Sequence, residues 1–312
     1  MKYFKYLLVT LVTIYFLTAV GDYFYSKSIK EKPLFSGEVQ EWNRVINGDI
    51  KTDLAVFGSS RAMIHINPKI LKDSLNVEVF NLGLNGSKFK MQYYRFLTYL
   101  KHNPKPQIIV WNLDTFSFSH IDEVFQPNQY TPFMLFNYSL YRYLKEYKET
   151  NLLDFVLPFY RYRDQEYWKN ELKKSAKEKV NKTGDFREKG FKSYNRKWNV
   201  NWATLKAKDA DFDTDVYPLL EELIKRCKEE DIQLIFTIAP EYYKGQDYML
   251  NRKEIIDKYQ STLKKYNLPL LDFSNDSISY QQKWFYNTTH LTDKGADEFT
   301  GQLARQLKQY TK

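Results

Sequence analysis

Five short apolar runs alternate with longer amphipathic stretches, and this alternation constrains the fold more than any other feature. The runs are expected to be buried strands at 53–57, 77–82, 107–113, 232–238 and 268–272. The stretches between and after them are expected to be helices, from Pro68 onward and at 89–101, 216–230, 253–266 and 293–309. Strands separated by helices favour a mostly parallel sheet covered on both faces. The sequence therefore predicts an α/β chain with a three-layer α/β/α sandwich, and it leaves the strand order open.

A serine stands where the first expected strand ends. The run 54–57 leads into Gly58-Ser59-Ser60, which places Ser60 at the carboxyl edge of the sheet, where open α/β folds bind their ligands. His290 precedes the last expected helix, which would pack against the same sheet. A serine hydroxyl is a poor nucleophile at neutral pH unless a base such as imidazole takes its proton. Ser60 and His290 are therefore the candidate catalytic pair.

The order of these motifs resembles the SGNH branch of the GDSL hydrolase family. The family's first block, Gly-Asp-Ser, reads Gly58-Ser59-Ser60 here, and its last block, Asp-x-x-His, reads Asn287-Thr288-Thr289-His290. The stretch 80–86 is similar to the second block, whose glycine donates a backbone N–H to an oxyanion, and this role falls on Gly86. The third block supplies an asparagine side chain after a buried strand, for which Asn112 and Asp114 are the candidates. The resemblance also implies that the Ser60 N–H is an oxyanion donor.

Asn287 departs from this pattern. The family's aspartate orients the histidine ring and stabilises its cation, and in serine proteases an asparagine at that position favours the wrong imidazole tautomer. A Ser60–His290 dyad, or a carboxylate from elsewhere such as Asp272 or Asp293, would be the alternatives. Asn287 is thus an altered triad position.

Several of these residues also have a purely structural interpretation. Ser60 or Asn67 could begin a helix as an N-cap ahead of Pro68. Gly83 and Gly86 could permit a tight turn between a strand and a helix. Asn112, Asp114 and Asp272 would more often stabilise the ends of their strands than take part in chemistry.

The amino terminus indicates a membrane segment. The run 6–21 is uncharged and follows Lys2 and Lys5. Its length as a helix is about 24 Å, and the aromatic residues at 23–25 extend it toward the roughly 30 Å of a bilayer core. We therefore expect an anchor at 1–26 with the remaining chain outside the cytoplasm, either periplasmic or at the cell surface. A signal peptide that is cleaved near Ala19-Val20-Gly21 is the alternative.

The remaining chain is expected to contain a lead-in at 27–52 and one SGNH-like domain at 53–312. A segment at about 119–214 is rich in Tyr, Phe, Trp, Lys and Arg and forms an insert in this domain. Aromatic and cationic side chains suit contacts with sugar rings and anionic polymers, whereas the alternative is a cap whose aromatic residues pack on the core.

Composition excludes several classes of function. The net charge is +9, but no nucleic-acid motif accompanies it, so we expect acidic glycans or anionic lipid rather than nucleic acid as partners. The single cysteine excludes an internal disulfide. Four histidines without ligand spacing argue against a metal site, and no phosphate-binding loop indicates a cofactor.

The motif Gly-Ser-Ser-Arg resembles a membrane-anchored, extracytoplasmic branch of the family that is similar to polysaccharide O-acyltransferases. This resemblance implies an esterase or O-acyltransferase acting on acyl esters of a cell-envelope or exported polysaccharide, with an acylated polysaccharide or small acyl ester as substrate. A membrane-bound acyltransferase is then an expected partner. The alternative is an inactive SGNH-like protein that binds glycan or scaffolds a membrane assembly.

Overall fold

The computed structural model describes residues 2–31, 37–164, 167–170 and 187–311. The chain forms two compact units. Unit 1 comprises Met1–Asn43 and Ile121–Phe186, and unit 2 comprises Arg44–His120 and Arg187–Lys312. The segment 119–214 is therefore divided between the units: its first part folds with the N-terminal helix, and the part from Arg187 onward folds with the sheet.

Unit 2 is built on a parallel sheet with the strand order β2-β1-β3-β4-β5. The strands are β1 (Leu54–Phe57), β2 (Val79–Asn81), β3 (Ile108–Asn112), β4 (Gln233–Ile238) and β5 (Leu270–Asp272). Each strand pairs with its neighbours in parallel. The α/β class and the five expected strands are confirmed. Because the chain runs from β1 to β2 on one side and later to β3 on the other, the carboxyl ends of β1 and β3 border a topological switch point.

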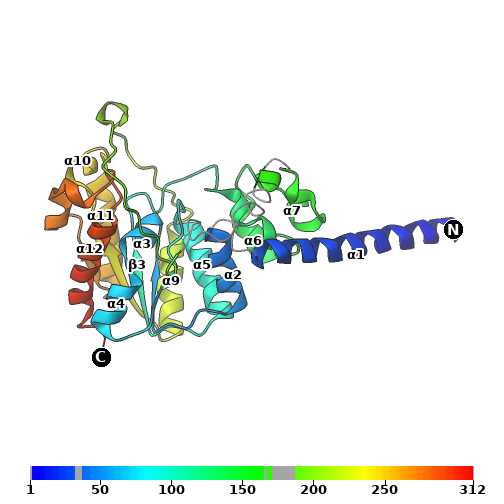
Figure 1. The fold of residues 1–312 in the computed structure, drawn as a ribbon, viewed down its shortest axis with the longest axis horizontal. Coiled ribbons are helices and arrows are strands. Elements are labelled where there is room, and N and C mark those ends of the chain that lie inside the picture. The colour runs from blue at the N-terminus through cyan, green and yellow to red at the C-terminus, as the bar shows by residue number, and fades with distance from the viewer. Residues whose placement is uncertain (1, 32–36, 165–166, 171–186, 312) are drawn as a thin grey trace. The chain divides into compact units, whose positions relative to one another are not determined.

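The strands are apolar because helices cover both faces of the sheet. Leu54 and Val56 of β1 belong to one apolar cluster with residues of α4 (Pro68–Leu75) and α12 (Asp293–Leu307). Phe57, next along β1, lies on the opposite face of the sheet, which α5 (Phe89–His102) covers. Its ring stacks on that of Trp111 of β3 with centroids 5.2 Å apart. Figure 1 shows α12 and α5 on opposite sides of the sheet.

The expected helices of unit 2 are present with shifted ends. The later ones are α9 (Pro218–Glu229) and α11 (Arg252–Lys265), with the short α10 (Tyr243–Gln246) between them. Asn67 caps α4, with Pro68 in its first turn, and Thr292 caps α12. The sequence did not predict α3 (Ser60–His65), because six residues are too few to show a helical period.

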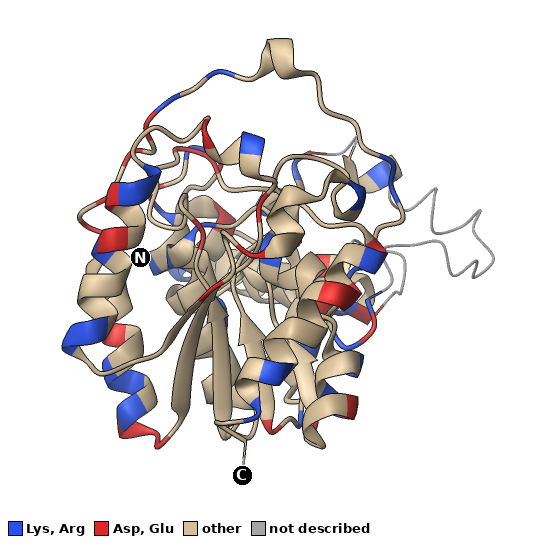
Figure 2. Ribbon diagram, turned by 90° about the vertical axis from the view of Figure 1, so that its left-hand side faces the viewer, with Lys and Arg blue, Asp and Glu red and all other residues tan. Residues whose placement is uncertain are grey.

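Charged residues on the flanking helices are mixed in sign. Figure 2 shows basic and acidic residues interspersed along these helices, while most of the strand residues are uncharged. Pairs such as Lys253 with Asp257, 2.5 Å apart, and Lys225 with Glu229 join successive helical turns on the surface.

Unit 1 contains α1 (Lys2–Glu31), most of α2 (Gly37–Asn47), α6 (Tyr138–Leu144) and α7 (Leu153–Val156). Helix α1 is long and apolar enough to cross a membrane. It continues to Glu31, beyond the expected end near Tyr25. Helix α2 lies within the segment 27–52 that was expected to be a lead-in.

Candidate active site

The turn that presents Ser60 requires glycine at its start. Gly58 has φ +141°, and a Cβ at this position would lie 2.8 Å from the Ala62 Cβ and 2.9 Å from the Asn112 carbonyl oxygen. Ser59 is the N-cap of α3, and its buried hydroxyl accepts a hydrogen bond from the Arg61 N–H. Ser60 is the first residue of α3, so its own N–H has no acceptor within the helix. The turn therefore leaves both the hydroxyl and the N–H of Ser60 available for other partners.

His290 lies beside Ser60, although 230 positions separate them in the sequence. The Ser60 Oγ is 3.0 Å from the His290 Nε2. The histidine belongs to a loop in which Phe285 and Leu291 form an antiparallel bridge, and the His290 carbonyl accepts the Tyr286 N–H. This backbone pairing holds the ring at the carboxyl edge of the sheet.

Asn287 holds the other side of the His290 ring. Its Oδ1 lies 3.2 Å from the His290 Nδ1 and also accepts the backbone N–H groups of His290 and Thr289 at 2.8 and 3.0 Å. Two backbone donors require an oxygen, so the amide must turn its oxygen and not its nitrogen toward the ring. An oxygen acceptor places the proton on Nδ1 and leaves the lone pair of Nε2 facing Ser60. The loop thus favours the tautomer that a general base needs, and only the negative charge is missing.

The environment disfavours the charged form of His290. Burial, together with the guanidinium groups of Arg61 and Arg196, lowers its pKa to about 4. At neutral pH the ring is therefore an unprotonated base. The same positive surroundings, without a carboxylate, weaken the stabilisation of the imidazolium that a proton transfer from Ser60 would create.

Two rings fix the position of His290. Tyr286 stacks parallel to it, with centroids 5.6 Å apart and planes 5° apart. The buried His65 meets it edge to face at 6.0 Å, and the His65 Nε2 accepts the Leu291 N–H at 3.2 Å. Burial, Arg61 and His290 hold the pKa of His65 well below its usual value, so this ring is also neutral. Two neutral imidazoles can pack together without charge repulsion.

Arg61, directly after Ser60, is fully buried and joins α3 to the ends of two strands. Its Nη1 lies 3.0 Å from Asp114 Oδ1, after β3, and 2.6 Å from Glu241 Oε1, after β4. Its Nη2 donates to the Ala239 carbonyl. Glu241 also pairs with Arg252 at 3.3 Å, so two cations face two carboxylates. The sequence interpretation missed this network, although an arginine after the serine and a glutamate after β4 were the available signals.

Gly86 lies in a turn that follows the end of β2. The Leu84 N–H donates to the Gly58 carbonyl at 2.8 Å, which brings the segment to the turn that carries Ser60. Gly86 is exposed, with φ +63°. Gly83 has another role: its N–H donates to Asn81, and a Cβ there would lie 2.4 Å from the Met63 nitrogen of α3. Gly83 allows close packing, while Gly86 lies in the loop beside the site.

Asn112 and Asp114, the candidates for the third block, make their hydrogen bonds within the protein interior. Both atoms of the Asn112 amide are engaged inside the protein: Nδ2 donates to Asp114 and Oδ1 accepts the Ala239 N–H. Asp114 is fully buried against Arg61, and burial raises its pKa while Arg61 lowers it. The two side chains hold the ends of β3 and β4 together.

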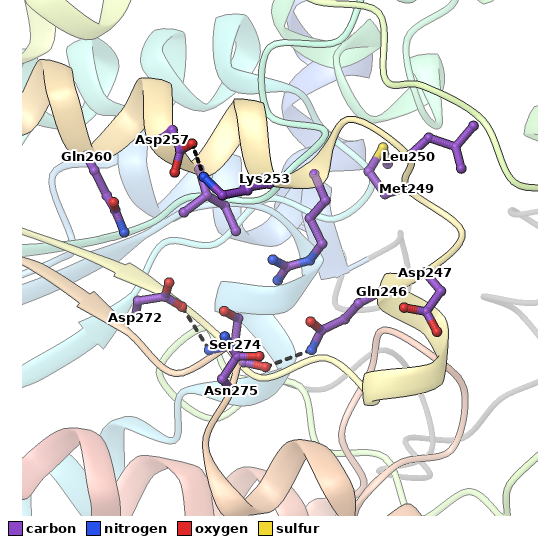
Figure 3. A pocket seen from close by; sticks show the side chains of 12 residues that line it. Gln246, Asp247, Met249, Leu250, Lys253, Asp257, Gln260, Asp272, Ser274 and Asn275 are labelled. Atoms are coloured by element: carbon purple, nitrogen blue, oxygen red, sulfur yellow. Dashed lines mark hydrogen bonds and ion pairs between the residues drawn. The ribbon is translucent and has the colours of Figure 1, made fainter.

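The alternative carboxylates lie elsewhere. Asp293 is half-buried in the first turn of α12, where its carboxylate accepts the Lys294 N–H. Asp272 accepts the Ser274 N–H at 2.9 Å and lines a cavity of about 560 Å³ (Figure 3). The residues that line this cavity include Lys253 and Gln246 but neither member of the Ser60–His290 pair. Asn287 is thus the group that the structure places at Nδ1, together with the Thr289 hydroxyl at 3.1 Å.

Metal ligands do not gather in the part of the chain that the structure describes. There, His, Cys, Asp and Glu side chains form no group of three or more that could hold a metal ion.

Cys227 of α9 is buried, and burial raises the pKa of its thiol to about 12.

Comparisons with known proteins find similarity in structure only. No family model matches the chain, and no curated protein matches it in sequence. Among solved structures, it is similar to a GDSL-like lipase from Bacteroides thetaiotaomicron, at 10% identity and TM-score 0.42, over 86% of this chain and 98% of that one. It is also similar to a chain described as a lipolytic protein of the G-D-S-L family from Desulfitobacterium hafniense, at 14% identity and TM-score 0.39, over 82% and 99% of the two chains. An acetyl xylan esterase from Butyrivibrio proteoclasticus is similar at 9% identity and TM-score 0.36, over 82% of this chain and 63% of that one.

Proposed function

We propose that the protein is an SGNH-type serine esterase or O-acyltransferase that acts on acyl esters of a cell-envelope or exported polysaccharide. The observation that carries the proposal is the 3.0 Å contact between Ser60 Oγ and His290 Nε2, in a loop whose Asn287 oxygen selects the basic tautomer. Two side chains from opposite ends of the chain meet in the geometry of a nucleophile and its base.

In the proposed reaction, Ser60 Oγ attacks the ester carbonyl carbon while His290 Nε2 takes the hydroxyl proton. The N–H groups of Ser60 and Gly86 stabilise the oxyanion that forms. As the C–O bond to the leaving alcohol breaks, Nε2–H gives its proton to that alcohol, which leaves an acyl-serine. Water or a sugar hydroxyl then attacks the acyl carbon while His290 Nε2 takes its proton. As the C–O bond to Ser60 Oγ breaks, Nε2–H returns that proton to Oγ, which restores the serine and the neutral base. Hydrolysis and transfer differ only in this second nucleophile.

Residues beside His290 support a carbohydrate or anionic substrate. The Arg196 guanidinium lies 4.2 Å from the centroid of the Tyr194 ring and 5.5 Å from that of Tyr286, which stacks on His290. Arg196 is exposed and Tyr194 is partly exposed. Aromatic faces suit sugar rings, and an exposed guanidinium beside the base suits a carboxylate or phosphate of the polymer. Segment 187–214 thus contributes to the site, whereas the aromatic residues near Phe159 belong to unit 1.

The proposed address is extracytoplasmic, with α1 as the retained anchor. The basic residues Lys2 and Lys5 precede the apolar run, which favours a cytoplasmic amino terminus. Protease added to intact spheroplasts should then digest unit 2 and spare cytoplasmic markers. Complete protection of unit 2 would contradict this topology.

We further propose a membrane-bound acyltransferase as the partner that supplies acyl groups.

Asn287 favours a second candidate function. Without a carboxylate, the site could bind an acylated glycan without turning it over and serve as a scaffold in a membrane assembly. A glycan-binding protein would keep the Tyr194–Arg196 pair and the loop that carries His290, but it would not form an acyl-serine.

The test uses the full chain in detergent with 4-nitrophenyl acetate and with a fluorophosphonate probe. We expect slow acetate release and modification of Ser60, located by mass spectrometry of the labelled peptide. Ser60→Ala should abolish both, and His290→Ala should reduce both to nearly the same degree, because the two residues act as a unit. The control is His120→Ala at an exposed histidine, which should retain full activity. Wild-type protein that binds acetylated glycan but neither hydrolyses esters, transfers acyl groups to sugars nor reacts with the probe would favour the second candidate.

A further inference from the structure

In residues 152–159 of unit 1, most apolar side chains are exposed and the charged side chain is buried. This is the reverse of what a water-exposed segment usually shows. Their sequence is Leu-Leu-Asp-Phe-Val-Leu-Pro-Phe, and the single charged residue, Asp154, is buried while apolar residues face outward. We call residues 152–159 and Phe136 together the apolar ledge. Its outward side chains are 40% to 61% exposed: Phe136, Leu152, Leu153, Val156, Leu157 and Phe159. A group of large apolar side chains of this kind indicates a surface that something other than water covers.

The ledge lies against the apolar part of α1. The Tyr15 hydroxyl donates to the Val156 carbonyl at 2.5 Å, and the Tyr15 ring is 6.5 Å from that of Phe136. Nearer the C-terminal end of α1, the Phe159 ring packs over Gly21, and its centroid lies 5.9 Å from that of the Tyr25 ring. In Figure 1, α7 lies beside α1. The ledge is therefore continuous with the surface of the candidate membrane span.

The depth of this contact along α1 is informative. Tyr15 precedes Gly21, where the uncharged run ends, by six positions, which is about 9 Å along a helix at 1.5 Å per residue. Interfacial apolar segments enter a bilayer by about 5–10 Å below the headgroup boundary. If α1 spans the bilayer, the ledge is at the level of the outer acyl chains.

Polar groups beneath the ledge are paired internally, as this environment requires. Arg161 Nη1 donates to Asp22 Oδ2 at 2.8 Å, and the Phe159 N–H donates to the same carboxylate. Ser26 accepts from Arg161 at 2.9 Å. Asp154 pairs with Arg163 and accepts the Asn151 N–H. These charged groups are thus paired with one another within unit 1, which lowers the cost of contact with lipid.

We propose that the apolar ledge is a second membrane contact, inserted into the outer leaflet beside α1. Unit 1 would then be partly embedded in the membrane and not fully exposed to water. The occupant of the ledge is the acyl region of the bilayer. The inference rests on the proposed anchoring by α1 and is independent of the proposed ester chemistry. The ledge and α1 together would hold unit 1 in one orientation on the membrane, because two contacts restrict rotation that a single helix allows.

The experiment measures depth with nitroxide labels on the full chain. Single cysteines are introduced in a Cys227→Ala background, reconstituted in phosphatidylcholine–phosphatidylglycerol vesicles, and compared for collision with oxygen and with a water-soluble nickel chelate. Leu153→Cys and Leu157→Cys report on the ledge. Phe16→Cys, on α1, is the lipid reference, and Leu250→Cys, exposed in unit 2, is the water reference. All four side chains are exposed, so the labels displace no core contacts.

We expect the ledge labels to collide several-fold more often with oxygen than with the chelate, as Phe16→Cys does, and Leu250→Cys to show the reverse. Ledge labels that behave as Leu250→Cys does would overturn the proposal. Labels that are inaccessible to both reagents would also overturn it, because a second copy of the chain would then cover the ledge. A water-like label at Phe16→Cys would refute anchoring by α1, and the ledge insertion with it, while leaving the esterase assay unaffected.

Discussion

Replacing Asn287 with aspartate should increase catalysis, and the structure indicates by how much. Asn287→Asp conserves shape, and a carboxylate oxygen can accept the three N–H groups that the amide oxygen now faces, from Thr289 N, His290 N and His290 Nδ1. The substitution adds one negative charge beside the ring. Because the existing loop already selects the basic tautomer, the gain should come from the charge alone.

The magnitude follows from the pKa of His290. A carboxylate at this range typically raises the pKa of a cationic group by about one to three pH units, or roughly 1.4–4 kcal/mol. The proton is only partly transferred in the transition state, so about half of this should appear in the barrier. We expect kcat/KM to rise about 3- to 30-fold. The loss of about 10⁴ in kcat that the corresponding asparagine causes in a serine protease includes the wrong tautomer and is an upper limit.

The assay is the pH profile of kcat/KM with 4-nitrophenyl acetate for wild type and Asn287→Asp. Wild type should lose activity only as the pH falls through about 4, where His290 becomes protonated. The variant should lose activity at a higher pH and have a higher plateau. Thr289→Val, which removes the hydroxyl beside Nδ1 without adding charge, is the control and should leave the acid limb near that of wild type. A folded Asn287→Asp variant with an unchanged plateau and an unchanged acid limb would refute His290 as the base.

Three further predictions concern stability. The folded protein should lose stability as the pH falls from about 6.5 to about 4, because the unfolded chain binds protons at His290 and His65 in this window and the folded chain does not; His290→Gln should reduce the loss of unfolding free energy by up to roughly 3 kcal/mol and leave the part that His65 contributes. A wild-type curve as flat as that of the variant would contradict the lowered pKa. Arg61→Met should cost about 3–5 kcal/mol, because it leaves two carboxylates buried without their shared cation, and urea denaturation would measure the loss; a loss below 1 kcal/mol would show that the network is dispensable. Gly58→Ala should lower the melting temperature and the reactivity of Ser60 together, because its Cβ would strike Ala62 and the end of β3; unchanged values of both would contradict the strained turn.

The sequence by itself determined the layers of the fold and the two segments, around Ser60 and His290, that form the candidate site. Apolar runs of five to seven residues between amphipathic stretches favour strands covered on both faces, which is why all five strands could be predicted. The run 6–21 indicated the apolar helix for a similar reason, since its length and lack of charge are local properties. Ser60 and His290 could be selected as candidates because each stands next to a recognisable element end.

Tertiary structure alone decided what the polar side chains do. The sequence shows that Asn287 lacks a charge, but the direction of its amide depends on two backbone N–H groups of a folded loop. The sequence suggests Asn112 as an oxyanion donor, but only the folded ends of β3 and β4 show that its amide contacts Asp114 and the Ala239 N–H. Arg61, Asp114 and Glu241 meet only because three separate segments end at one sheet edge. Hydrogen bonds and ion pairs depend on positions within a fraction of an ångström, and such positions are set by long-range packing that no local pattern of residues encodes.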